Sequence, residues 1–249
     1  MTSKAPGSCC ISGVMHDGES IGEFKDIAGT ETYLSYPPDK KTEYGIVYIC
    51  DAFGMQFVNN RLLADSMAHA GYFVVMPDIF HGDPVPTDAF SPGATFDFQK
   101  WLPKHPKEQI DSIVDAAIKA MRSEFGVKKI GAVGYCFGGK YVVRFLAEGK
   151  GLDAGFIAHP SLVVREELKA IRGPLSIAAA EIDHVMSPEN RHESEEILLK
   201  LGVPYQLTLY GAVEHGFAVR TDLSDKRKKF AMESAYFQAI RWFDEWLKN

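Results

Sequence analysis

The sequence has few cysteines, and their spacing is not typical of a disulfide framework or a metal centre. Four cysteines occur in 249 residues, at positions 9, 10, 50 and 136, and no two have Cys-x-x-Cys spacing. The adjacent Cys9 and Cys10 make a poor chelate without other ligands, and no His-x-x-x-His pattern is present. We therefore expect free thiols in a reducing, cytoplasmic environment, and we predict no metal and no cofactor.

Long apolar runs and long blocks of like charge are also missing. No stretch reaches the roughly 18 apolar residues of a membrane span, and residues 1–13 lack the apolar core of a secretory signal. The net charge of -6 disfavours nucleic acid and anionic membranes as partners. We expect a small-molecule partner, with no role for nucleic acid or membrane, and we leave homodimer formation open.

Buried strands alternate with helices along most of the chain. Two short strands at 24–28 and 31–36 flank a hairpin turn, and a helix is predicted to begin at Asn59 and Asn60. The apolar runs that predict further strands are 44–50, 72–76, 130–133, 154–158, 175–180 and 205–210. This alternation predicts one α/β domain over 1–249, with a leader segment at 1–23 and a mostly parallel central sheet flanked by helices on both faces.

Residues 77–104 interrupt the alternation. The segment holds five prolines and few periodic apolar positions. A loop of this length inside a compact domain is usually a lid or a binding segment. We therefore predict that residues 77–104 form a lid or substrate loop.

A Gly-Tyr-Cys-Phe-Gly-Gly string at 134–139 joins a predicted strand to a predicted helix. Gly-x-nucleophile-x-Gly at such a junction is the pattern of a nucleophile elbow, where glycines permit a tight turn. The N-terminal end of the following helix favours a thiolate at Cys136. The alternative is that Cys136 is a small buried apolar residue, but the third glycine and the flanking elements favour a nucleophile.

A nucleophile at this position needs a base and an acid at later strand ends. Asp183 follows the strand at 175–180 and His215 follows the last strand, which is the α/β-hydrolase order of nucleophile, acid and histidine. His215 would accept the proton of Cys136, and Asp183 would orient the imidazole. Backbone N–H groups of Ala52 and Phe137 would form the oxyanion hole.

Other residues compete for these roles. His159 also follows a predicted strand and is the second candidate for the base, and His81 lies at a strand end as well. Glu181 is the rival acid, disfavoured because it is still close to its strand. His184 neighbours Asp183 but belongs to the wrong chain segment.

The string at 134–139, the Asp183 segment and the His-Gly-Phe-Ala string at 215–218 strongly resemble the dienelactone hydrolase family, cysteine members of the α/β-hydrolase superfamily. The resemblance extends from about Lys25 onward. It includes Asp-Ala-Phe-Gly at 51–54 and Met-Pro-Asp-Ile-Phe at 76–80.

The resemblance implies the α/β-hydrolase fold and the hydrolysis of an ester or lactone through a thioacyl enzyme. Cys136, Asp183 and His215 would be the triad. In bacterial members a glutamate that governs the resting thiol precedes the oxyanion residue, and the shorter Asp51 stands at that position here.

The same bacterial enzymes hold a substrate carboxylate with two arginines. The first has no clear counterpart in His81-Gly82-Asp83, and Arg220 lies one residue away from the position of the second. Asp51, His81, His159 and Arg220 are therefore candidates for substrate binding or for modulating the site.

Three functions are compatible with these features. The favoured one is a cysteine-dependent ester or lactone hydrolase. The second is a non-hydrolytic or ring-rearranging member of the same fold in a secondary-metabolite pathway, which activity on simple aryl esters would distinguish from the first. The third is a non-catalytic small-molecule binding module, and the complete set of triad residues at strand ends argues against it.

Overall fold

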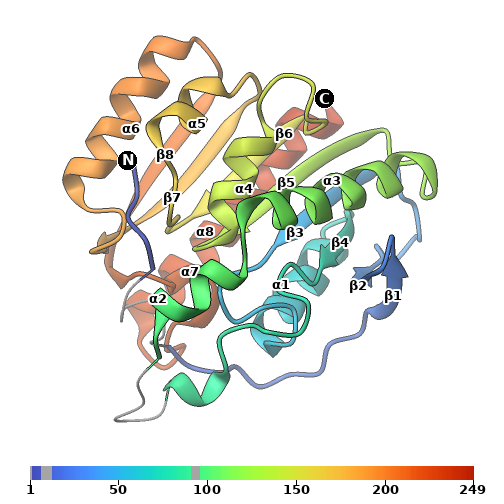
Figure 1. Cartoon of the computed structure of the whole chain (residues 1–249), viewed down its shortest axis with the longest axis horizontal. Helices are drawn as coiled ribbons and strands as arrows, with labels where there is room; N and C mark the ends of the chain where they lie inside the picture. The colour runs from blue at the N-terminus through green and yellow to red at the C-terminus, as the bar shows by residue number, and fades with distance from the viewer. Residues whose placement is uncertain (1, 7–12, 91–95) are drawn as a thin grey trace.

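The computed structural model describes residues 2–6, 13–90 and 96–249 (Figure 1). Cys9 and Cys10 lie outside the described residues. In the described part of the chain, eight strands form one sheet in the order β1-β2-β4-β3-β5-β6-β7-β8. The strands are β1 (Glu23–Ile27), β2 (Thr30–Ser35), β3 (Tyr44–Ile49), β4 (Phe73–Pro77), β5 (Lys129–Tyr135), β6 (Ala154–Ala158), β7 (Leu175–Ile182) and β8 (Tyr205–Glu214).

The sheet is parallel from β4 to β8, and only β1 and β2 are antiparallel to their neighbours. The antiparallel pair is joined by Ala28 and Gly29, which both have positive φ, at 52° and 82°. Two successive residues of this kind are typical of a type I′ hairpin turn. The predicted hairpin and the predicted mostly parallel sheet are both present.

Helices cover both faces of the sheet. α3 (Lys107–Ser123), α4 (Gly138–Phe145) and α5 (Arg165–Ala170) lie on one side, while α1 (Val58–His69) and α8 (Lys226–Lys248) lie on the other. Figure 1 shows α3 and α4 in front of the sheet and α8 behind it. This arrangement confirms the predicted fold class.

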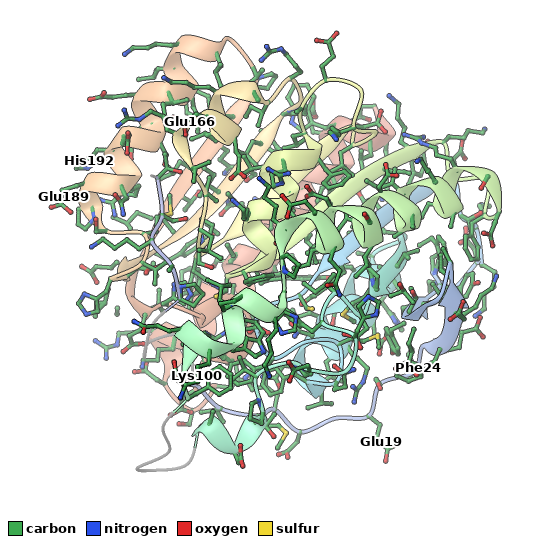
Figure 2. The ribbon with its side chains drawn as sticks, viewed as in Figure 1. Glu19, Phe24, Lys100, Glu166, Glu189 and His192 are labelled. Carbon is green, nitrogen blue, oxygen red and sulfur yellow. The ribbon has the colours of Figure 1, made fainter. Side chains whose placement is uncertain are left out.

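α6 (Pro188–Leu201) packs beside α5 and follows its sequence signals closely. The Ser187 hydroxyl caps its first turn, Pro188 occupies the first helical position, and Gly202 ends it in a left-handed conformation. Its outer face is exposed at Glu189 and His192 (Figure 2).

The start of α1 differs from the sequence-based prediction. The residue that precedes the helix is Phe57, and Asn59 and Asn60 lie inside the first turn, fully buried. The Asn59 amide donates to the carbonyl oxygens of Val14 and Val219, and the Asn60 amide donates to Asp51. These side chains are used for tertiary contacts and not for capping, which local sequence could not reveal.

β7 and β8 extend further than the apolar runs suggested. A register irregularity between Ala180 and Ile182 lets β7 continue to Ile182 and β8 continue to Glu214. The Glu181 carboxylate accepts the Ala212 N–H at 2.7 Å in this irregular region. Asp183 and His215 therefore directly follow the last paired residues of two neighbouring strands.

The segment 77–104, expected as a loop, contains short helices within its described residues. These are the 3₁₀ turns η2 (Thr87–Phe90) and η3 (Leu102–Lys104) and the short helix α2 (Phe98–Trp101). The side chain of Asp97 caps α2 by accepting the N–H groups of Gln99 and Lys100.

The strand order reverses direction at β3, which lies between β4 and β5. The chain leaves β3 toward α1 on one face and leaves β5 toward α4 on the other face. Because these two connections diverge, the carboxyl ends of β3 and β5 border the crevice where open α/β sheets bind ligands. The topology thus places the segments after Ile49 and Tyr135 at this crevice.

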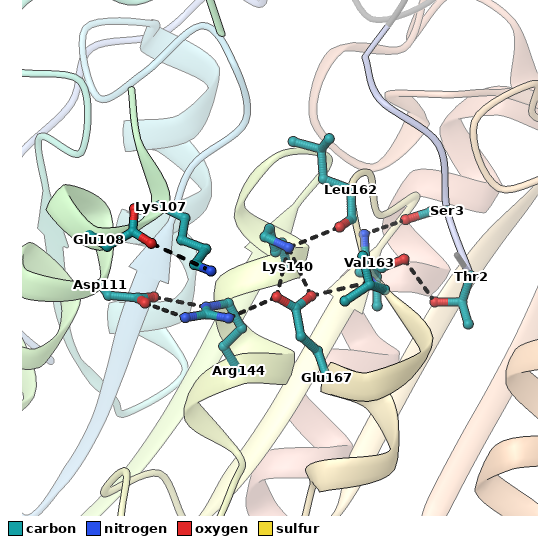
Figure 3. A network of polar contacts seen from close by, with 11 residues as sticks. Thr2, Ser3, Lys107, Glu108, Asp111, Lys140, Arg144, Leu162, Val163 and Glu167 are labelled. Atoms are coloured by element: carbon teal, nitrogen blue, oxygen red, sulfur yellow. Dashed lines mark hydrogen bonds and ion pairs between the residues drawn. The ribbon is translucent and has the colours of Figure 1, made fainter. Parts of the chain in front are cut away.

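A network of polar contacts holds the loop that follows β6 (Figure 3). Lys140 donates to the Leu162 carbonyl oxygen at 3.1 Å and pairs with Glu167 at 2.7 Å. Arg144 joins Glu167 to Asp111 of α3. These half-buried ion pairs link α3, α4 and α5 to the loop, so its backbone is anchored from one side.

The first described residues anchor the same loop from the other side. The Ser3 hydroxyl accepts the Val163 N–H at 2.9 Å, and the Thr2 N–H donates to the Val163 carbonyl oxygen at 2.9 Å. The Lys4 N–H donates to the Val185 carbonyl oxygen in the loop after β7. Thr2 and Ser3 are buried, so this part of the expected leader at 1–23 belongs to the folded core.

Candidate active site

Cys136 lies at the tip of a strained turn between β5 and α4. Its φ is 48°, a left-handed value that is uncommon for a residue with a side chain. The Cys136 N–H donates to the Ala158 carbonyl oxygen, and its own carbonyl accepts the N–H groups of Gly139 and Ser161. The turn is therefore held by hydrogen bonds from β6, its own helix and the loop after β6.

The flanking glycines are required by close approach of neighbouring backbone. A Cβ atom on Gly134 would lie 2.6 Å from the Gly138 carbonyl oxygen, and one on Gly138 would lie 2.0 Å from the Ile49 carbonyl oxygen. Any side chain there would push the turn away from β3. The glycines of the predicted nucleophile elbow thus have a steric reason in this structure.

Three side chains from three strand ends meet in one chain of contacts. Cys136 Sγ lies 3.0 Å from His215 Nε2, and His215 Nδ1 lies 2.9 Å from Asp183 Oδ2. The other Asp183 oxygen accepts the N–H groups of Val185 and Met186 at 2.8 and 3.0 Å. This arrangement fixes the carboxylate, and through it the imidazole, in one orientation.

The charges within this group stabilise one another in a buried setting. Burial alone would lower the pKa of His215, but the Cys136 sulfur and the Asp183 carboxylate outweigh burial and raise it well above the usual range. Burial would raise the pKa of Asp183, but the hydrogen bonds from His215, Met186 and Val185 hold it below its ordinary value. A protonated imidazole between a thiolate and a carboxylate is therefore favoured.

Ala52 and Phe137 are the two candidates for the oxyanion hole. Both residues are buried, and neither N–H donates to an acceptor among the described residues. Buried N–H groups without an acceptor are rare in folded proteins. The two amides are thus available to an oxygen atom of a ligand.

Asp51 and Arg220 form a fully buried ion pair below the Ala52 turn. Arg220 donates to Asp51 Oδ2 at 2.5 Å, and each side chain is 1% exposed. The other Asp51 oxygen accepts from the Asn60 amide and the Phe53 N–H. Burial raises the pKa of the Asp51 carboxyl, although Arg220 opposes the shift. Sequence reasoning treated Asp51 and Arg220 as separate candidates and missed Asn60, whose position carried no signal for this contact.

His159 lies beside the triad without joining it. Its ring centroid is 5.0 Å from that of His215 and its residue is fully buried. Ser161, which was not proposed as a site residue, places its hydroxyl oxygen 3.9 Å from Cys136 Sγ. The imidazole that lies 3.0 Å from the sulfur belongs to His215, which favours His215 over His159 as the base.

The remaining candidates lie away from this group. His81 and His184 are exposed, and the Glu181 carboxylate is occupied with the Ala212 N–H. Glu181, the rival acid, thus binds the backbone of β8 and not the imidazole of His215. Cys50 is buried, and burial together with Asp51 raises the pKa of its thiol.

The described part of segment 77–104 covers the nucleophile turn with aromatic rings. Phe80 and Trp101 pack on Phe137 with ring centroids 5.2 and 5.8 Å away. The Val85 N–H donates to the Ala52 carbonyl oxygen at 2.8 Å. Cys136 itself is 0% exposed.

A cavity of about 310 Å³ adjoins the histidine side of the site. Its lining includes His215, Phe217, Arg220, Lys228 and Val14. Among the residues with described positions, no cluster of three or more histidines, cysteines or acids could hold a metal ion. None of the helices in the described ranges combines the length and apolar character needed to cross a bilayer.

Comparisons with known proteins agree on one family. The sequence model of the dienelactone hydrolase family matches residues 30–247 of this chain. Hydrolase pyvD of Aspergillus violaceofuscus is 51% identical over 249 residues, with 100% of both chains covered. Dienlactone hydrolase 1 of Gibberella moniliformis is 34% identical and covers 98% of this chain and 95% of its own.

A comparison with solved structures shows that the fold is shared. A proposed dienelactone hydrolase from Klebsiella pneumoniae superimposes with a TM-score of 0.77 at 15% identity, covering 92% of this chain and 100% of the other. At this level of identity the likeness shows the shared fold.

Proposed function

This chain belongs to the dienelactone hydrolase family, and we propose that it cleaves an ester or lactone through a triad of Cys136, His215 and Asp183 and a thioacyl-enzyme intermediate. Members of the family are ester and lactone hydrolases, so the chain is an enzyme of that class. The observation that carries the proposal is the 3.0 Å contact between Cys136 Sγ and His215 Nε2, with Asp183 behind the imidazole.

The first half of the reaction acylates the cysteine. His215 holds the proton of Cys136, and the thiolate attacks the carbonyl carbon of the ester or lactone. The resulting oxyanion accepts hydrogen bonds from the amides of Ala52 and Phe137. When the tetrahedral intermediate collapses, the C–O bond breaks and the imidazolium returns its proton to the leaving alkoxide.

The second half releases the acid. His215 removes a proton from water, and the hydroxide attacks the thioester carbonyl within the same oxyanion hole. The C–S bond breaks, and the sulfur leaves as a thiolate that the imidazolium stabilises. The buried Asp183 carboxylate keeps the imidazole oriented in both halves.

Asp51 and Arg220 support this chemistry by holding the turn that bears Ala52. The ion pair and the Asn60 amide occupy both carboxylate oxygens. Separating the two partners of a buried ion pair would leave each as an uncompensated charge, which costs free energy. The pair therefore holds the backbone that bears its two side chains in place. We therefore assign the pair to positioning the Ala52 N–H.

The test is hydrolysis of aryl esters, lactones and thioesters by wild type and by Cys136→Ala. We expect wild type to turn over at least one class and the variant to lose turnover while it keeps its folded circular dichroism spectrum. Iodoacetamide should alkylate Cys136 faster than Cys50 near neutral pH, because Cys50 is a buried thiol with a raised pKa. Full turnover by Cys136→Ala would rule out the mechanism.

The same panel separates hydrolysis from ring rearrangement. In oxygen-labelled water, a hydrolase places one labelled oxygen in the carboxylic acid product. A reaction that rearranges the substrate without hydrolysis leaves the product unlabelled. We expect the label in the acid.

A further inference from the structure

His159 occupies a defined position next to the nucleophile. Tyr135 of β5 pairs with Ala158 of β6, so Cys136 and His159 are the first residues beyond two adjacent strand ends. The Cys136 N–H donates to the Ala158 carbonyl oxygen, and the His159 N–H donates to the Ala178 carbonyl oxygen of β7. Adjacent parallel strands are about 4.8 Å apart, so the two residues are neighbours at the carboxyl edge of the sheet.

The ring of His159 has no hydrogen-bond partner in the described protein. Both ring nitrogens are buried, and neither makes a hydrogen bond with the described residues. The ring instead faces His215 at 5.0 Å and Phe217 at 5.7 Å between centroids. Buried polar side-chain atoms are paired in most proteins, so two unpaired nitrogens on one ring indicate a place for a ligand group.

The backbone of the loop that bears His159 is anchored at several points. His159 and Leu162 have positive φ values of 37° and 62°, uncommon for residues with side chains and typical of functional loops. The Lys140 ammonium and the Lys4 backbone fasten Leu162, as the Figure 3 network shows for Lys140. A hydrogen-bonding group held in this way is preorganised for one ligand position.

The ring is neutral, and the nearby guanidinium is already paired. Burial, followed by the positive charges of His215 and Arg220, lowers the pKa of His159 well below its usual range. Arg220 is paired with Asp51 and is 1% exposed. A neutral imidazole donates from one nitrogen and accepts at the other, which suits a hydroxyl or carbonyl oxygen better than a carboxylate.

We propose that His159 is a specificity-determining residue that binds an uncharged hydroxyl or carbonyl oxygen on the acyl part of the substrate, close to the scissile carbonyl. The proposal rests on the hydrolase function proposed above and narrows its substrate class. The preferred substrate is accordingly an ester or lactone of a hydroxy or oxo acid, and a carboxylate at that position is disfavoured.

The test compares phenyl esters of matched size whose acyl groups differ at one position. The probes are phenyl butyrate, its 2-hydroxy and 3-hydroxy analogues, and monophenyl succinate, which carries a carboxylate. For wild type we expect a hydroxy ester to have the highest kcat/KM and the carboxylate ester the lowest. The preference for hydroxyl over hydrogen should be about 10-fold to 100-fold, as expected for a buried hydrogen bond.

Two variants then assign the preference to His159. His159→Phe keeps a ring of similar size but no hydrogen-bonding atom, so the preference should disappear, mainly through KM. His159→Gln keeps a donor and an acceptor and should restore part of it. His192→Phe, on the exposed face of α6 (Figure 2), is the matched control and should retain the preference.

Alkylation of the thiol separates specificity from structural damage. Iodoacetamide should label Cys136 in His159→Phe at a rate within about twofold of wild type, since the hydrogen bonds of the triad do not involve His159. The proposal is overturned if wild type shows no hydroxyl preference, if it favours the carboxylate ester, or if His159→Phe slows all esters equally. Turnover that is independent of Cys136 would instead refute the hydrolase mechanism.

Discussion

Asp183→Asn should disable the base while leaving the fold in place. In wild type, Asp183 Oδ1 accepts two backbone N–H groups, from Val185 and Met186, and Oδ2 faces His215 Nδ1 at 2.9 Å. An asparagine at this position must direct its oxygen at the two amides, because its NH₂ group cannot accept their hydrogens. Its NH₂ group then points at His215 Nδ1.

That orientation forces the wrong tautomer on the imidazole. With a donor opposite it, Nδ1 must act as the acceptor, so the proton of a neutral His215 moves to Nε2. Nε2 lies 3.0 Å from Cys136 Sγ and can no longer accept the thiol proton. In a triad, this change lowers kcat by about ten-thousandfold, or about 5 kcal/mol of transition-state stabilisation.

The assay is steady-state hydrolysis of an aryl ester together with iodoacetamide labelling of Cys136. We expect kcat to collapse with little change in KM, and labelling near neutral pH to slow because the imidazolium partner of the thiolate is lost. His184→Gln, at an exposed neighbour, is the control and should behave as wild type. An Asp183→Asn enzyme within tenfold of wild-type kcat would show that another group orients His215.

Two further predictions concern stability. Arg220→Met leaves Asp51 buried without its charge partner and should lower the free energy of unfolding by about 3–5 kcal/mol, measured by urea denaturation; Arg227→Met, at an exposed pair, should cost far less. The pKa of His215, lowered by burial but raised more strongly by Cys136 and Asp183, is about 10 in the folded state. Its contribution is therefore complete below the unfolded value of about 6.5 and is lost as pH rises toward about 10. We expect Tm to fall more steeply over this window in wild type than in His215→Ala, and parallel curves would contradict the assignment.

The positions of the triad candidates were readable in the sequence because each depends on a local pattern. An apolar strand that ends in Gly-x-Cys-x-Gly, and later strands that end near Asp183 and His215, are short-range features. Parallel strands place their carboxyl ends at one edge of the sheet, so local patterns and chain order were enough to predict that these segments meet. The mostly parallel sheet followed from the same alternation of strands and helices.

Contacts between distant segments were decided only by the tertiary structure. Arg220 and Asp51 are 169 residues apart in sequence, and their pairing depends on how α7 (Phe217–Arg220) packs against the turn after β3. The same holds for Asn60. The sequence predicted that this residue begins a helix, whereas in the folded chain its side-chain amide donates a hydrogen bond to Asp51. Side-chain partners across a core depend on the packing of whole elements, which no short pattern encodes.

The lengths of the strands and the contacts of the N-terminal segment were also decided by the tertiary structure. The irregular pairing near Ala180 carries β8 to Glu214, beyond the apolar run that marked the strand, because a register shift is a property of two strands together. Thr2 and Ser3 have no distinctive sequence pattern, yet they hydrogen-bond to Val163 in the folded chain. The sequence by itself determined which residues stand at the strand ends, because each strand is marked by a short run of apolar residues. The tertiary structure determined which partners hold these residues in place, because those partners come from distant parts of the chain that meet only when whole elements pack together.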